Sequence, residues 1–86
     1  MEYLVFCGSK NNKTFLLKSE NRSEINNAIQ KFLDEHNFRS YYWRLCRNDK
    51  CTWIDVGSYT EFFYIFDTEE KMNKFLTDEH TMLYRM

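Results

Sequence analysis

Three cysteines and two histidines are the side chains of this chain best suited to redox or metal chemistry. Cys46 and Cys51 flank the turn Asn48-Asp49, so we expect them to face each other across a two-residue hairpin turn, close enough to form a redox-sensitive disulfide. We favour two reduced surface thiols over this bridge, because a cytoplasmic protein keeps its cysteines free. The pair would supply only half of a zinc site, which His36 and His80 would have to complete. We therefore predict no metal and no cofactor.

The segment around Cys7 contains fragments of two catalytic motifs. A thiol nucleophile needs a base and an orienting group, and no recognisable pattern near Cys7 supplies them, so we expect a core thiol. Residues 8–14 place Lys13-Thr14 after Gly8, as a phosphate-binding loop does. However, Asn12 replaces the second glycine, and a strand follows where a helix N-terminus must receive the phosphate. We interpret the segment as a polar hairpin turn, and we predict no catalytic residues and no enzymatic activity.

The hydrophobic pattern predicts the elements that position these side chains. Residues 25, 28, 29, 32 and 33 are apolar at helical spacing, and a capping box formed by Asn21 and Glu24 precedes them. A second capping box, formed by Asp67 and Glu70, precedes a similar apolar stripe. The expected elements are strands at residues 2–7 and 14–17, a helix at 22–36, a hairpin at 41–56, an interior strand at 61–66 and a helix at 68–84.

This order, ββαβββα, predicts a single α+β domain over residues 1–86, since the chain contains no linker or repeat. Two amphipathic helices need an apolar surface, and an antiparallel sheet offers one. We therefore expect a mostly antiparallel five-stranded sheet with both helices packed on one face. The opposite face is then free to bind a partner.

The central hairpin has two faces of different character. With Asn48-Asp49 as the turn, paired residues have numbers that sum to 97. One face, with Tyr41, Trp43, Leu45, Thr52, Ile54 and Val56, is expected to join the core. The other face opposes Cys46 to Cys51, Arg44 to Trp53 and Tyr42 to Asp55, and we expect it to meet solvent.

Positive charge gathers at the same hairpin. Residues 39–51 carry a local charge of +3 and residues 67–80 one of −3, although the whole chain carries only −1. Trp, Tyr and Arg are enriched at protein-binding hot spots. We therefore expect a partner protein with an acidic surface to bind here. The predicted binding residues are Tyr42, Arg44, Arg47, Lys50, Trp53 and Asp55.

These features favour a small protein-interaction module, an inhibitor or adaptor that binds a host or defence protein. An origin in a phage or mobile element fits the many residues with AT-rich codons. RNA or single-stranded nucleic acid, stacked on Tyr42 and Trp53, is the alternative, and the acidic start of the last helix argues against it. Homodimerisation through the free sheet face is a second alternative. No signal peptide or long apolar run is present, which predicts a cytoplasmic protein without a membrane span.

Overall fold

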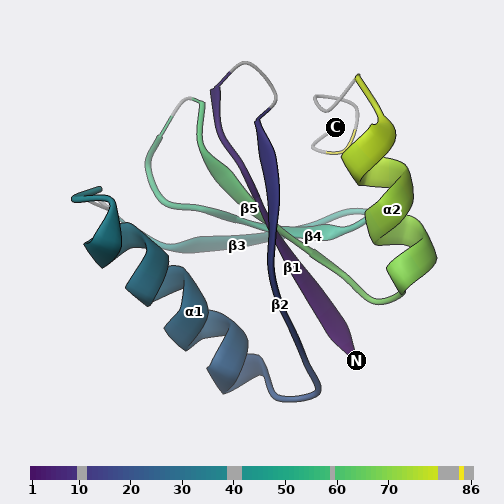
Figure 1. Cartoon of the computed structure of the whole chain (residues 1–86), viewed down its shortest axis with the longest axis horizontal. Coiled ribbons are helices and arrows are strands. Elements are labelled where there is room, and N and C mark those ends of the chain that lie inside the picture. Colours follow the sequence, from purple (N-terminus) through teal and green to yellow (C-terminus); the bar gives the residue numbers. More distant parts are fainter. Residues whose placement is uncertain (10–11, 39–41, 59, 80–83, 85–86) are drawn as a thin grey trace.

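The computed structural model describes residues 1–9, 12–38, 42–58, 60–79 and 84. The elements are β1 (Glu2–Cys7), β2 (Lys13–Ser19), α1 (Arg22–Glu35), β3 (Arg44–Arg47), β4 (Thr52–Asp55), β5 (Phe62–Phe66) and α2 (Glu69–Thr77). The strands form one antiparallel sheet in the order β2-β1-β5-β4-β3 (Figure 1). The predicted α+β class, the five strands and the element order are confirmed.

The two helices pack on opposite faces of the sheet, so the prediction that both lie on one face is wrong (Figure 1). Alternate residues of β5 divide between two cores: Phe63 joins the cluster under α1, and Tyr64 joins the cluster under α2. The physical reason lies in β5, whose five residues are all buried. A central strand that is apolar on both faces needs cover on both sides, and each helix supplies one side.

The first helix begins and ends close to where the sequence predicts. The Asn21 side chain accepts a hydrogen bond from the Ser23 amide at 3.0 Å and so caps the helix. Glu24 does not bond directly to the Asn21 amide as in a simple capping box. Instead, the Ser19 hydroxyl accepts from that amide at 3.0 Å and donates to the Glu24 carboxylate at 2.9 Å. Asn37, just beyond the end, adopts a left-handed φ of 52°.

The second helix is shorter than expected, because it ends at Thr77 and not at residue 84. Its N-cap is Thr68, whose hydroxyl accepts from the Lys71 amide at 3.1 Å, so the predicted cap at Asp67 is also wrong. Asp67 instead forms an ion pair with Lys71 at 3.0 Å. After the helix ends, Tyr84 packs against the ring of Phe75 at 4.9 Å between centroids and is buried.

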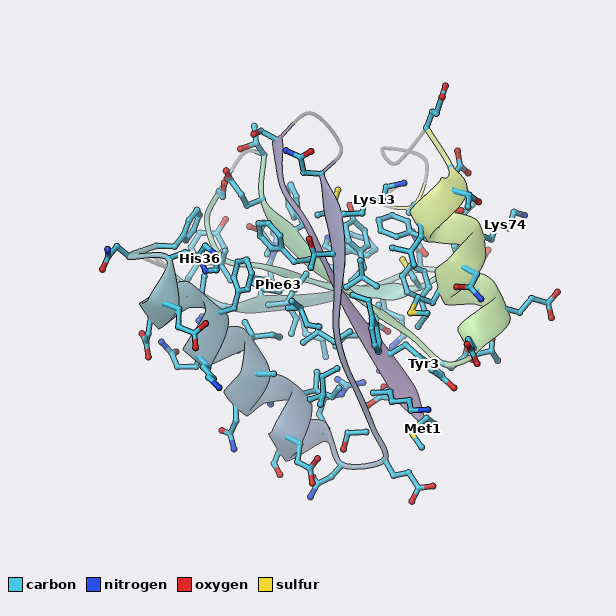
Figure 2. The ribbon with its side chains drawn as sticks, viewed as in Figure 1. Met1, Tyr3, Lys13, His36, Phe63 and Lys74 are labelled. Atoms are coloured by element: carbon cyan, nitrogen blue, oxygen red, sulfur yellow. The ribbon has the colours of Figure 1, made fainter. Side chains whose placement is uncertain are left out.

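Lys13 joins the first hairpin to the end of α2. Its Nζ donates hydrogen bonds to the carbonyl oxygens of Phe75 and Asp78, and it lies 4.3 Å from the centre of the Phe75 ring (Figure 2). A lysine placed at a helix C-terminus satisfies carbonyls that have no intrahelical donor and complements the helix dipole. The lysine that gave the segment its likeness to a phosphate loop therefore has a structural partner within the chain.

Candidate functional site

The β3–β4 hairpin has a longer loop than the sequence suggested. Arg44 pairs with Asp55, and Arg47 pairs with Thr52, so partner numbers sum to 99 and not 97. The loop is closed by Asn48, whose side-chain oxygen accepts from the amides of Lys50 at 2.8 Å and Cys51 at 3.0 Å. An Asn side chain that imitates a backbone turn lengthens the loop to four residues.

The change of register alters the pairs but not the composition of each face. A shift of two residues equals the side-chain period of a strand, so every described residue of the two strands keeps its side of the sheet. Tyr41 lies outside the described residues. All three predicted pairs are nevertheless wrong: Asp55 lies opposite Arg44 and not Tyr42, and Trp53 lies opposite Cys46 and not Arg44, so Cys46 does not face Cys51. The geometric argument for a Cys46–Cys51 disulfide is thereby removed.

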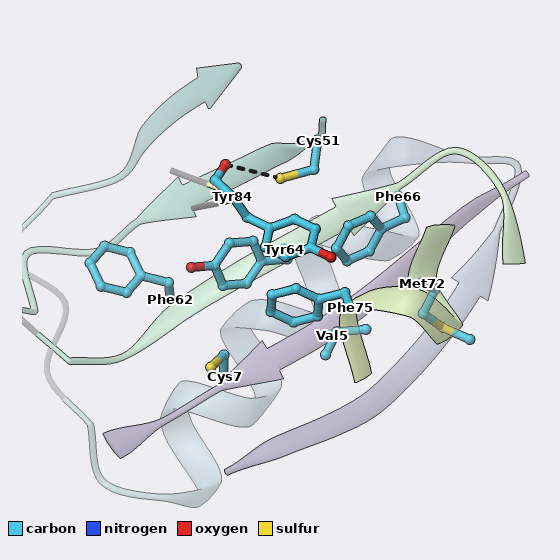
Figure 3. Packing of buried hydrophobic residues seen from close by; sticks show 9 residues of the cluster. All are labelled: Val5, Cys7, Cys51, Phe62, Tyr64, Phe66, Met72, Phe75 and Tyr84. Carbon is cyan, nitrogen blue, oxygen red and sulfur yellow. Dashed lines mark hydrogen bonds between the residues drawn. The ribbon is translucent and has the colours of Figure 1, made fainter. Parts of the chain in front are cut away.

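The two hairpin cysteines have different surroundings, and both are free thiols. Cys46 is half-buried on the edge strand. Cys51 lies in the loop, is buried, and donates from its Sγ to the carbonyl oxygen of Tyr84 at 3.6 Å (Figure 3). Burial raises the pKa of the Cys51 thiol to about 11, against a smaller opposing effect of Lys50.

Alkylation should therefore distinguish the cysteines. The thiolate is the nucleophile, and a pKa of about 11 leaves roughly one Cys51 molecule in a thousand as thiolate at pH 8. We expect iodoacetamide to add one label to the folded protein, at Cys46, and three labels in denaturant, with Cys7 also protected by burial. Peptide mass spectrometry reads the positions. If mild oxidation removed the labels of both Cys46 and Cys51 in denaturant, the two thiols would form a disulfide after all.

Asp55 organises one end of the hairpin from a buried position. Its Oδ2 accepts from the Tyr42 hydroxyl at 3.4 Å and from Nη2 of Arg44 at 3.2 Å. Its Oδ1 accepts from the Gly57 amide at 2.9 Å, at a turn where glycine has a φ of 90°. Three predicted site residues, Tyr42, Arg44 and Asp55, are thus brought together. Asp55 itself holds the other two in place and has little surface to offer a partner.

Trp53 also contributes less surface than expected. It is half-buried and packs against the core under α2, since this helix covers the face that was expected to be free. Arg47 and Lys50 are exposed, Arg47 at the end of β3 and Lys50 in the loop. Of the six predicted residues, Tyr42, Arg44, Arg47 and Lys50 therefore have accessible side chains.

Exposed apolar side chains gather beside these cations, and the sequence assigned two of them to the core. Among the described residues, the large exposed hydrophobic side chains are Met1, Phe15, Tyr42, Trp43 and Leu45. Three of these five occur within four consecutive residues, with Trp43 at 39% and Leu45 at 54% exposure. The reason is position: β3 is the last strand of the sheet, whereas α1 packs over β2 at the other end. We call Tyr42, Trp43, Arg44, Leu45 and Arg47 the edge patch.

A groove of about 170 Å³ runs beside the edge patch on the α1 side of the sheet. Trp43, Leu45 and Ile54 form its apolar wall. Arg22 and Asn26, from the start of α1, form its polar wall. The groove can accept a small apolar side chain next to a cation.

The charged segments at 39–51 and 67–80 are neighbours in the fold. Asp49 and Lys50 of the hairpin loop line a hollow of about 350 Å³ together with Lys71, Lys74 and Asp78 of α2 and its end. Three lysines and two aspartates are among the side chains that line this hollow. Of the described cations of the hairpin, Lys50 lies at this hollow, whereas Arg44 and Arg47 belong to the edge patch.

Within the described residues, no three His, Cys, Asp or Glu side chains are grouped so as to hold a metal ion. His36 stacks on Phe32 at 4.0 Å and pairs its Nδ1 with the Phe32 carbonyl at 2.9 Å, a role in closing α1. His80 lies outside the described residues. The described helices include none long and apolar enough to cross a membrane.

Comparisons of the chain with protein-family models, with curated proteins and with solved structures found no match. The exposed apolar and cationic side chains of the edge patch are therefore the guide to function.

Proposed function

We propose that this chain is a small, non-enzymatic interaction module that binds an acidic surface of a partner protein through the edge patch. It acts as an inhibitor or adaptor of the kind that phages and mobile elements direct against a host or defence protein. Its working place is the cytoplasm, where its three thiols stay reduced.

The exposure of Tyr42, Trp43 and Leu45 in and just before the edge strand β3 carries this proposal. Scattered exposed hydrophobic residues are ordinary, but contiguous ones with polar neighbours are typical of interaction sites. Arg44 and Arg47 flank the apolar residues and supply the charge that would select an acidic partner. Tyr, Trp and Arg are also the residues that contribute most at measured hot spots.

Nucleic-acid binding has weaker support from the same residues. Trp53, one of the two stacking platforms that this function requires, packs against the core under α2. A protein partner would contact both the exposed apolar side chains and the cations beside them, which fits the edge patch better than a nucleic acid does.

Photo-crosslinking tests the proposal in a bacterial lysate. A benzophenone amino acid at Leu45 places the crosslinker inside the edge patch, and the same amino acid at Phe15 is the matched control. Phe15 is exposed to a similar degree, at 44%, on the opposite edge strand. We expect one acidic protein to be crosslinked from position 45 and not from position 15, and to be identified by mass spectrometry.

Competition then shows whether the capture is specific. Excess wild-type chain should abolish the crosslink, whereas the Trp43→Ser/Leu45→Ser variant, shown to be folded by circular dichroism, should fail to compete. Equal competition by both proteins would refute the edge patch as the binding site. Crosslinks to a second copy of the chain would indicate homodimerisation, and a nuclease-sensitive crosslink would indicate nucleic acid; either result overturns the proposal.

A further inference from the structure

The two edges of the sheet differ in their protection against another strand. The β2 edge carries the exposed Lys18, and its pairing with β1 is interrupted by a β-bulge near Leu16. Lysines and bulges are devices that discourage strand pairing, and α1 packs over β2 as well. At the other edge, β3 has a regular register with β4 and an uncharged interior formed by Leu45 and Cys46.

The backbone of β3 directs hydrogen-bonding groups toward the open edge. The Asn48 amide donates to the Cys51 carbonyl at 3.1 Å, so the hydrogen-bonding pattern of the antiparallel ladder continues one step into the loop. Hydrogen-bonded and non-hydrogen-bonded pairs alternate in such a ladder. Cys46 and Arg44 therefore direct their amides toward β4, whereas Leu45 and Arg47 direct theirs away from it.

The edge patch would contact the two faces of an incoming strand with different side chains. On the α1 side, Trp43 and Leu45 border the groove of about 170 Å³. On the α2 side, the exposed guanidinium of Arg44 stands beside Tyr42, fixed by Asp55. Because side chains of a strand alternate between faces, an apolar residue next to an acidic one would satisfy both.

We propose that β3 binds an extended, acidic segment of the partner by strand addition, which extends the sheet by one strand. The segment alternates β-branched residues, which enter the groove beside Leu45, with carboxylates that approach Arg44. Main-chain hydrogen bonds to Leu45 and Arg47 supply affinity, and the alternating pockets supply specificity. This inference rests on the proposed function and specifies how the edge patch recognises its partner.

Charge favours an acidic segment over a second copy of the chain. Pairing of β3 with the β3 of another copy would bring the guanidinium groups of both copies to one seam, those of Arg44 on one face of the sheet and those of Arg47 on the other. Like charges close together across a ladder destabilise it. An acidic strand would neutralise the same groups.

Fluorescence anisotropy with a defined probe tests the inference. The probe is a fluorescein-labelled ten-residue peptide that alternates valine with glutamate; its control alternates valine with lysine. We expect the acidic peptide to bind with a dissociation constant in the micromolar range and the basic peptide to bind at least about tenfold more weakly. Failure of the acidic peptide to bind at about 1 mM chain would overturn strand addition.

A backbone substitution separates strand addition from side-chain docking. Ligation at Cys46 joins recombinant residues 1–45 to a synthetic segment 46–86 in which Arg47 is N-methylated, so that its outward amide is lost while its side chain stays. We expect peptide affinity to fall about tenfold. N-methylation of Glu69 is the control and should leave affinity unchanged, because a first-turn amide of α2 has no intrahelical acceptor.

The outcomes distinguish this inference from the proposed function. If N-methyl-Arg47 and wild type bind the acidic peptide equally while Leu45→Ser weakens binding, the edge patch docks its partner through side chains alone and strand addition is wrong. If the acidic peptide does not bind but the partner is still crosslinked from position 45, the proposed function stands and strand addition is wrong. Sedimentation could also show that the unmodified chain self-associates and that N-methyl-Arg47 abolishes this association. A second copy would then occupy the β3 edge, and the proposal of an acidic partner segment would be wrong.

Discussion

Replacement of Phe75 by alanine is expected to lower the free energy of unfolding by about 3 to 5 kcal/mol, which is typical of a buried phenylalanine. Phe75 has no exposed surface. Its ring lies 4.5 Å from that of Tyr64 and 5.1 Å from that of Phe66, between centroids. The alanine variant would leave a cavity between α2 and the sheet, and Lys13 would lose its aromatic neighbour.

Urea denaturation followed by circular dichroism measures this loss. Phe15→Ala is the matched control, since Phe15 is a phenylalanine of the same sheet with 44% exposure, and it should cost less than about 1 kcal/mol. If Phe75→Ala lowered the free energy of unfolding as little as Phe15→Ala does, α2 would not cover this face of the sheet. The face would then be free, as the sequence suggested.

Asp55→Ala is expected to cost about 2 to 3 kcal/mol, because the substitution removes the acceptor of three hydrogen bonds, one of them to a guanidinium. Most of the carboxylate is shielded: the side chain of Asp55 is 12% exposed, whereas that of Arg44 is 67% exposed. The variant should also bind the partner more weakly, since Tyr42 and Arg44 lose the group that orients them.

Thermal and urea unfolding at neutral pH measure the stability part of this prediction. Asp49→Ala, in the exposed hairpin loop, is the control and should change stability by less than about 0.5 kcal/mol. Asp55→Asn should cost less stability than Asp55→Ala and more than Asp49→Ala, because an amide oxygen still accepts a hydrogen bond but carries no charge. Equal stability of Asp55→Ala and Asp49→Ala would contradict the role assigned to Asp55.

Local features of the fold could be predicted from the sequence because short-range chemistry determines them. Asn21 and Asn37 mark the ends of α1 by their side-chain and backbone preferences. The run from Phe62 to Phe66 predicts an interior strand, and β5 is the central strand of the sheet. Each of these inferences needs only residues close together in the chain.

The placement of α2 could not be obtained in the same way, although β5 contained the signal. Phe63 and Tyr64 are adjacent, both aromatic and directed to opposite faces, so both faces required a helix. The periodicity of a helix shows which of its own faces is buried, but it does not show which face of the sheet it meets. That choice depends on contacts between residues far apart in the chain.

The role of the hairpin as a binding site stays a prediction, and the structure differs from the sequence-based expectation by exposing Trp43 and Leu45. Trp43 and Leu45 alternate with polar residues as core positions do, and Ile54, on the same face of the next strand, is indeed buried. The end position of β3 in the sheet changes the outcome for Trp43 and Leu45. The identity of the end strand depends on the pairing of β1 with β5, which no local pattern of the hairpin reveals.

The pairing of β1 with β5 also has a consequence for the synthesis of the chain. The centre of the sheet is made from residues 3–7 and 62–66, which leave the ribosome far apart in time. Until β5 emerges, the inner edge of β1 is uncovered, and the first hairpin with α1 has no strand that joins it to the β3–β4 hairpin. Such non-local pairing slows folding because the loop between the strands must close first. The inner edge of β1 is thus open only until β5 pairs with it, whereas the outer edge of β3 stays open in the folded chain.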